Sequence, residues 1–193
     1  MHDAKGCWRG VPVVRGIVSE LIMTNNIKTT GKHTETIESY EKYRDLVKGA
    51  NINEVTLLAT DYLNHFNEII MLIDMIADMP ECIEDVAAWK PKSYQDHFRD
   101  SGFSDKDLAV AAYEYVPVQF RQPFERLINQ LNALVLQVAS RLMEASVSEN
   151  QEEIAATALF GPELRLMVEK AGAIINGETE GHDQADIDAV LES

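Results

Sequence analysis

Residues 55–76 read VTLLATDYLNHFNEIIMLIDMI. Apolar side chains recur along this stretch at alternating intervals of four and three residues. These positions are Val55, Ala59, Tyr62, Phe66, Ile69, Ile73 and Ile76. Such heptad spacing places one apolar seam along a helix, as in helices that pack in bundles. The pattern predicts a long helix over about residues 53–79, with Asn53 as its N-cap and Pro80 ending it.

A second seam with the same spacing lies within residues 123–147. Its members are Phe124, Ile128, Leu131, Val135, Val138, Leu142 and Ala145. We expect a second long helix here, opened by Pro123. The two seams predict an all-α fold: a long antiparallel helical hairpin of the four-helix-bundle type. The side chains expected in its core are Phe66, Ile69, Ile73, Leu131, Val135 and Val138.

Shorter accessory helices fill the rest of the chain. Caps and breakers predict helices over residues 34–48, 81–89, 93–100, 149–159 and 162–176. One more helix should begin at a Ser104–Asp107 cap and end at Pro117. A two-helix layer leaves apolar surface open, so either the helices at 35–48 and 149–176 or a second copy of the chain should cover it. A homodimer is therefore one of the two arrangements expected.

Composition shifts divide the chain into four segments. Residues 1–34 lack a helical period and are expected to be an unstructured or mis-annotated tail, with Met23 as a candidate start. Residues 35–176 should form the helical bundle. Residues 177–183 contain no large apolar side chain and predict a flexible linker. Residues 184–193 are acidic and amphipathic, which predicts a tethered docking helix.

Charge and cysteine content exclude several classes of protein. The formal net charge of −15 disfavours nucleic acid as a partner, because neutralising phosphates requires a basic face. Two cysteines without a CxxC motif argue against a disulfide framework or a zinc cluster and suit a reducing cytoplasm. The longest apolar stretch, residues 69–77, contains Asp74 and falls short of the roughly 20 residues of a membrane span.

A polar ladder lies on the outer face of the first long helix. Asp61, Asn64 and Glu68 are spaced i, i+3 and i+7 and point away from the seam. Met71 and Met75 continue the same stripe. A solvated helix face is the plain interpretation. Apolar methionines beside the polar ladder favour a surface that a partner covers.

Two other groups of residues are weaker candidates. Glu125 and Asn129, at i and i+4, form a second acid–amide pair closer to its own seam. His65 and Glu68 resemble a reversed, single copy of the Glu-x-x-His motif of di-iron bundles, which need more ligands. We therefore expect His65 to flank the seam, and we expect no metal or cofactor of the chain's own.

The C-terminal sequence resembles a known docking peptide. Residues 183–191 read DQADIDAVL. This stretch looks like the peptides of the phosphatase CheZ and the flagellar switch protein FliM that bind the response regulator CheY. The resemblance implies a CheY-like partner, a role in chemotaxis and flagellar rotation, and a set of docking residues. These are Gln184, Asp186, Ile187, Asp188, Val190 and Leu191.

The polar ladder is similar in outline to the active-site motif of the CheZ family, Asp-Phe-x-Asp-x-x-x-Gln. Residues 61–68 read DYLNHFNE, with Asn64 at the acidic position, Glu68 at the amide position, and the motif on the first long helix instead of the second. Asp61-x-x-Asn64 also resembles the Glu-x-x-Asn pair of the CheC and CheX phosphatases.

These resemblances imply a phosphatase that acts on the aspartyl phosphate of a response regulator, which supplies the Mg²⁺. Asn64 would orient the attacking water, and Glu68 or Asp61 would pair with the regulator's lysine. If the exchange of acid and amide abolishes catalysis, the expected function is a non-enzymatic adaptor that binds the regulator.

Overall fold

The computed structural model describes residues 37–178. The chain divides into two units, Met1–Ser39 and Tyr40–Ser193. Only residues 37–39 of the first unit are described, and they are helical. The described residues form helices, turns and loops without a strand among them, which confirms the predicted all-α class.

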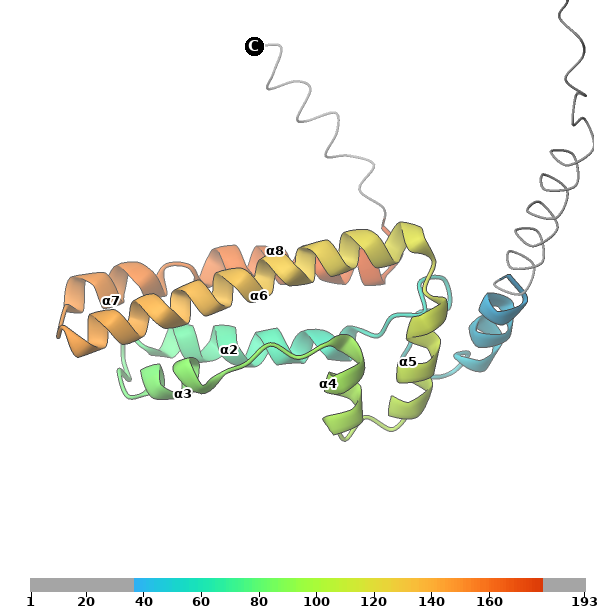
Figure 1. The fold of residues 1–193 in the computed structure, drawn as a ribbon, viewed down its shortest axis with the longest axis horizontal. Coiled ribbons are helices and arrows are strands. Elements are labelled where there is room, and N and C mark those ends of the chain that lie inside the picture. Colours follow the sequence, from blue (N-terminus) through green and yellow to red (C-terminus); the bar gives the residue numbers. More distant parts are fainter. Residues whose placement is uncertain (1–36, 179–193) are drawn as a thin grey trace, which may run out of the picture. The chain divides into compact units, whose positions relative to one another are not determined.

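The second unit contains helices of very different lengths (Figure 1). Residues 40–46 are helical, and Gly49, with a φ of +83°, lies in the turn that follows. The later elements are η1 (Thr60–Leu63), α2 (Asn64–Met75), α3 (Cys82–Ala88), α4 (Tyr94–Asp100), α5 (Lys106–Ala112), η2 (Tyr113–Tyr115), α6 (Val118–Val147), α7 (Gln151–Ala158) and α8 (Gly161–Ile175).

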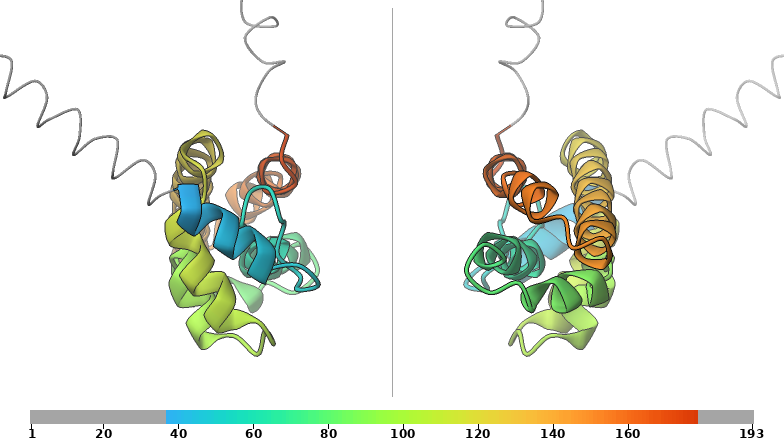
Figure 2. Two further views of the ribbon diagram at one scale, coloured as in Figure 1. Left: turned by 90° about the vertical axis from the view of Figure 1, so that its right-hand side faces the viewer. Right: turned by 90° about the vertical axis from the view of Figure 1, so that its left-hand side faces the viewer.

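One apolar core lies between α2, α3, α6 and α8, and α7 packs against α6. α2 packs against α3 and α8, and α6 packs against α3, α7 and α8, so the contacts close into a ring. The end-on views of Figure 2 show these helices around a common axis. All six side chains predicted for the core are at most 1% exposed. Both seams are therefore buried in one core, as their spacing predicted, and α3 and α8 connect α2 to α6.

The predicted hairpin differs in its first arm. α2 is a helix of 12 residues, not a helix over 53–79, because residues 53–59 form a loop. Asn53 does cap a turn, since its Oδ1 accepts hydrogen bonds from the N–H groups of Val55 and Thr56. Leu57 then has a φ of +60°, a left-handed conformation that ends the turn. Val55, the first seam position, is 50% exposed.

The second arm begins earlier than predicted. α6 starts at Val118, with Pro117 at its N-cap, and runs for 30 residues. Pro123, expected to open the helix, lies inside it, where its ring leaves the carbonyl of Gln119 without a helical donor. After α6 the chain reverses direction, and α7 and α8 pack along α6. The antiparallel hairpin therefore forms between α6 and the C-terminal helices.

The short helices agree with prediction except for one cap. Ser93 caps α4 by accepting a hydrogen bond from the N–H of Asp96, 3.1 Å away. Ser104 does not cap α5, which begins at Lys106 without a side-chain cap. Gly177, with a φ of +95°, ends α8 as expected.

Some predictions fall outside the described residues. They concern the tail at 1–34, most of the linker at 177–183 and the docking segment at 184–193. Among the helices of residues 37–178, none has the length and apolar character needed to cross a bilayer.

Candidate functional site

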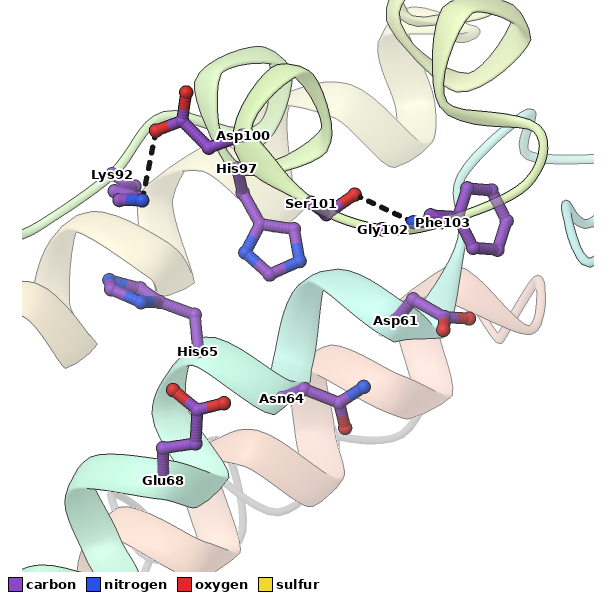
Figure 3. A pocket seen from close by; sticks show the side chains of 10 residues that line it. All are labelled: Asp61, Asn64, His65, Glu68, Lys92, His97, Asp100, Ser101, Gly102 and Phe103. Carbon is purple, nitrogen blue, oxygen red and sulfur yellow. Dashed lines mark hydrogen bonds and ion pairs between the residues drawn. The ribbon is translucent and has the colours of Figure 1, made fainter.

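A pocket of about 520 Å³ lies between α2 and α4, and the predicted ladder forms one of its walls (Figure 3). Asp61, Asn64, His65 and Glu68 line it from η1 and α2. The opposite side consists of Lys92, His97, Asp100, Ser101, Gly102 and Phe103. The structure thus brings all three predicted catalytic residues into one concave site.

The core fixes which face of α2 meets the pocket. Phe66 and Ile69 are fully buried, which turns Asn64 and Glu68 outward. Within residues 37–178, neither the Asn64 amide nor the Glu68 carboxylate has a hydrogen-bond partner. Asp61 differs, because its Oδ2 accepts a hydrogen bond of 2.6 Å from Nδ2 of Asn51. Asn64 and Glu68 therefore have polar atoms available to a ligand.

Tyrosine hydroxyls hold the opposite wall in place. The hydroxyl of Tyr62 donates to the carbonyl of Lys92 at 2.9 Å. The backbone N–H of Ala59 donates to the hydroxyl of Tyr94 at 2.8 Å. These bonds attach α4 and the segment before it to η1. On this wall Nζ of Lys92 pairs with Oδ2 of Asp100 at 2.9 Å.

His65 is a core residue of this site, not the flanking residue that was predicted. It is only 8% exposed and stacks on Trp89, with ring centroids 4.8 Å apart. Its Nε2 is buried without a hydrogen-bond partner among the described residues. Burial, together with nearby His97, lowers the pKa of His65 to about 4. His65 is therefore neutral at pH 7.

His97 lies closer to solvent on the α4 wall. Its ring centroid is 6.1 Å from that of His65. Burial, and then the charge of Lys92, lowers the pKa of His97, while the backbone carbonyl of Asp61 and the charge of Glu68 oppose this shift. The pocket thus holds two histidines that favour the neutral form.

The charge of the pocket is negative. Asp61, Glu68 and Asp100 supply three carboxylates against the single ammonium of Lys92. Such a site attracts cationic groups and repels a free phosphate anion. Among residues 37–178, no three His, Cys, Asp or Glu side chains form a group that could hold a metal ion.

In the second candidate pair, the carboxylate of Glu125 is already engaged. Glu125 and Asn129 line another pocket, of about 340 Å³. Oε1 of Glu125 accepts hydrogen bonds from Nε of Arg121 at 2.8 Å and from the hydroxyl of Tyr113 at 2.9 Å. The hydrogen bond from Arg121 lowers the pKa of Glu125. Since these partners occupy its carboxylate, the ladder on α2 is the better candidate.

Sequence reasoning did not identify Lys92, His97 or Asp100 as site residues. The spacing of Pro91 and Gly102 predicted a short helix over 93–100, yet it contained no signal of which face would meet α2. The docking residues expected at Gln184, Asp186, Ile187, Asp188, Val190 and Leu191 lie outside the described residues.

Comparison with known proteins leaves the family open. No family model, curated protein or solved structure matches this chain. The pocket and the sequence of the C-terminal segment are therefore the observations from which a function can be proposed.

Proposed function

We propose that this chain is a CheZ-like cytoplasmic protein of chemotaxis signalling, which binds a phosphorylated CheY-like response regulator and promotes hydrolysis of its aspartyl phosphate. The C-terminal segment 184–193 docks on the regulator, and the face of α2 acts on the phosphate. The observation that carries the proposal is the exposed Asn64–Glu68 pair. Both side chains lack hydrogen-bond partners within the described residues and line a negatively charged pocket.

An acid and an amide suit this reaction because of what the regulator already provides. Its aspartyl phosphate has a bound Mg²⁺ and a lysine. A water molecule positioned for in-line attack is what remains to be supplied. The amide of Asn64 accepts a hydrogen bond from such a water and orients it. A carboxylate that pairs with the lysine fixes the relative position of the two proteins.

The contacts of Asp61 and Glu68 indicate which of the two carboxylates pairs with the regulator's lysine. Oδ2 of Asp61 is held by Asn51, so this carboxylate stabilises the turn before α2. Glu68 is free in the described structure and is the better partner for the regulator's lysine. The negative charge of the pocket also favours a phosphate that is bound to the regulator together with Mg²⁺ and a lysine. It disfavours a free phosphate ester, because the carboxylates repel it.

A single substitution with a matched control tests the proposal. A purified response regulator, phosphorylated with a small phosphodonor, is mixed with the chain, and release of inorganic phosphate is measured. Asn64→Ala should abolish the acceleration. Asn67→Ala should retain it, because Asn67 is exposed on the same helix and does not line the pocket. Both variants should unfold within about 0.5 kcal/mol of the wild type.

The same assay tests whether the site lies on the other long helix, α6, instead of α2. Full activity of Asn64→Ala, combined with loss of activity in Glu125→Ala or Asn129→Ala, would contradict the assignment to α2. It would place the reaction at the second pocket.

One observation favours an adaptor that binds the regulator without hydrolysis. The ladder faces a wall formed by α4, so a regulator must fit its phosphate beside this wall to reach Asn64. An adaptor would bind the phosphorylated regulator with unchanged phosphate lifetime. Measuring binding and phosphate release on the same samples separates the two functions.

A further inference from the structure

The proposed reaction needs a group that accepts a proton, and the ladder does not provide one. The amide of Asn64 can orient water but is not basic near neutral pH. Glu68, in its proposed role, is neutralised by the regulator's lysine. Asp61 is engaged with Asn51. If this chain supplies the proton acceptor, that group comes from another part of the pocket.

We propose that His97 accepts the proton of the attacking water, as a catalytic residue of the proposed phosphatase on which this inference rests. His97 belongs to α4 and lines the same pocket as Asn64 and Glu68. Figure 3 shows its ring reaching from the α4 wall toward the ladder, between His65 and Asp61. The proposal places the attacking water between the pocket walls that carry Asn64 and His97.

Neighbouring aromatic rings orient His97. Its ring meets Tyr62 and Phe98 edge to face, with centroids 5.5 and 5.2 Å away. The backbone carbonyl of Asp61 is near enough to raise the pKa of His97, against the larger lowering by burial. A neutral imidazole that donates through one nitrogen has the other available as an acceptor. The proposal assigns that acceptor nitrogen to the pocket, which His97 lines.

Charges on every side of His97 bear on its protonation. His65, Asp61 and Glu68 face it from α2 and η1, while Lys92 and Asp100 lie on its own wall. Burial and Lys92 together lower its pKa, so the ring is neutral at pH 7 and able to accept a proton. His65 cannot take this role, because its Nε2 has no solvent contact.

The step balances within the complex. The water oxygen forms a bond to phosphorus, and the bond from phosphorus to the regulator's aspartyl oxygen breaks. The electron pair of that bond stays on the aspartate carboxylate. One proton of the water passes to the free nitrogen of His97 and then to solvent, and inorganic phosphate leaves with the other. No oxidant or reductant is needed.

The test is a pH profile of the full chain acting on saturating phosphorylated regulator, between pH 5 and pH 8. Wild-type kcat should fall below pH 6.5 as His97 becomes protonated, because burial lowers its pKa from that ordinary value. His97→Gln should lower kcat by about 100-fold or more, as expected for loss of a proton acceptor, and should remove the acid limb while KM stays unchanged. Arg99→Gln is the control, because Arg99 is exposed on α4 and does not line the pocket.

The possible results separate the two proposals. An unchanged acid limb in His97→Gln would overturn the role of His97 and leave the phosphatase standing. Wild-type protein that never accelerates phosphate release would overturn both. Detection of an acid-labile phosphoryl group on His97 would overturn proton acceptance, because the phosphoryl group would then be transferred covalently to the ring. If His97→Gln fails to fold, the wild type decides: a solvent deuterium isotope effect on kcat supports proton transfer, and its absence overturns it.

Discussion

Lowering the pH from 7 to 5 should destabilise this protein through His65. The side chain is 8% exposed, stacks on Trp89, and has a buried Nε2 without a hydrogen-bond partner among the described residues. His97, Lys92 and the carbonyl of Lys90 are the neighbours that affect its charge. Protonating this ring in the folded state would place a charge in an apolar setting beside another histidine and a lysine.

The size and sign of the effect follow from the two protonation states. The pKa of His65 falls from 6.5 to about 4 on folding. Between these values the unfolded chain binds a proton that the folded chain does not, so the free energy of unfolding decreases as the pH falls. The full difference is worth about 3 kcal/mol, of which about 2 kcal/mol is lost by pH 5. About one pH unit above the ordinary pKa of 6.5, both states are neutral and the contribution of His65 to the pH dependence disappears.

Urea unfolding followed by circular dichroism measures this effect, with His65→Phe as the comparison. Phenylalanine keeps a ring against Trp89 and does not titrate. The wild type should lose about 2 kcal/mol more than the variant between pH 7 and pH 5. His97 also has a lowered pKa and titrates in both proteins, so its contribution largely cancels. Equal losses in the two proteins would refute the buried, neutral assignment of His65.

Three further perturbations test other parts of the structure. Phe66→Ala should lower the free energy of unfolding by about 3–5 kcal/mol, because Phe66 is fully buried; a loss under about 1 kcal/mol would contradict its core position. Gly161→Ala should lower the melting temperature, because a Cβ at Gly161 would collide with the Asp74 carboxylate that pairs with Arg165; an unchanged melting temperature would show that this junction adapts freely. Deleting residues 184–193 should weaken the apparent affinity for phosphorylated regulator far more than the maximal turnover; unchanged affinity would remove the docking role of that segment.

Heptad spacing predicted the core because it depends only on the helical repeat. The seam positions from Tyr62 to Ile76, and those from Phe124 to Ala145, are all buried. The same spacing could not locate the start of α2. Val55 fits the period but lies in a loop, since the Asn53 side chain and the left-handed Leu57 form a turn in place of a helix. The hydrogen bonds accepted by the Asn53 side chain therefore determine the backbone conformation before α2.

The candidate site was predictable on one wall only. Asp61, Asn64 and Glu68 share a helix face, so their proximity follows from sequence spacing. Lys92, His97 and Asp100 reach the pocket because tyrosine hydroxyls attach the α4 region to η1. Those contacts join residues about thirty positions apart, and a helical period does not describe them.

The pocket and the C-terminal segment need each other in the proposed function. A pocket of about 520 Å³ bounded by short helices buries little surface, and stable protein interfaces bury roughly 1,200–2,000 Å². Its three carboxylates would attract the regulator's lysine and Mg²⁺, which orients an encounter more than it strengthens binding. Most of the affinity must then come from outside the pocket. In the proposed function, docking of residues 184–193 on the regulator supplies that affinity and raises the local concentration of regulator near Asn64. The pocket can therefore bind its target weakly and release the dephosphorylated regulator between turnovers.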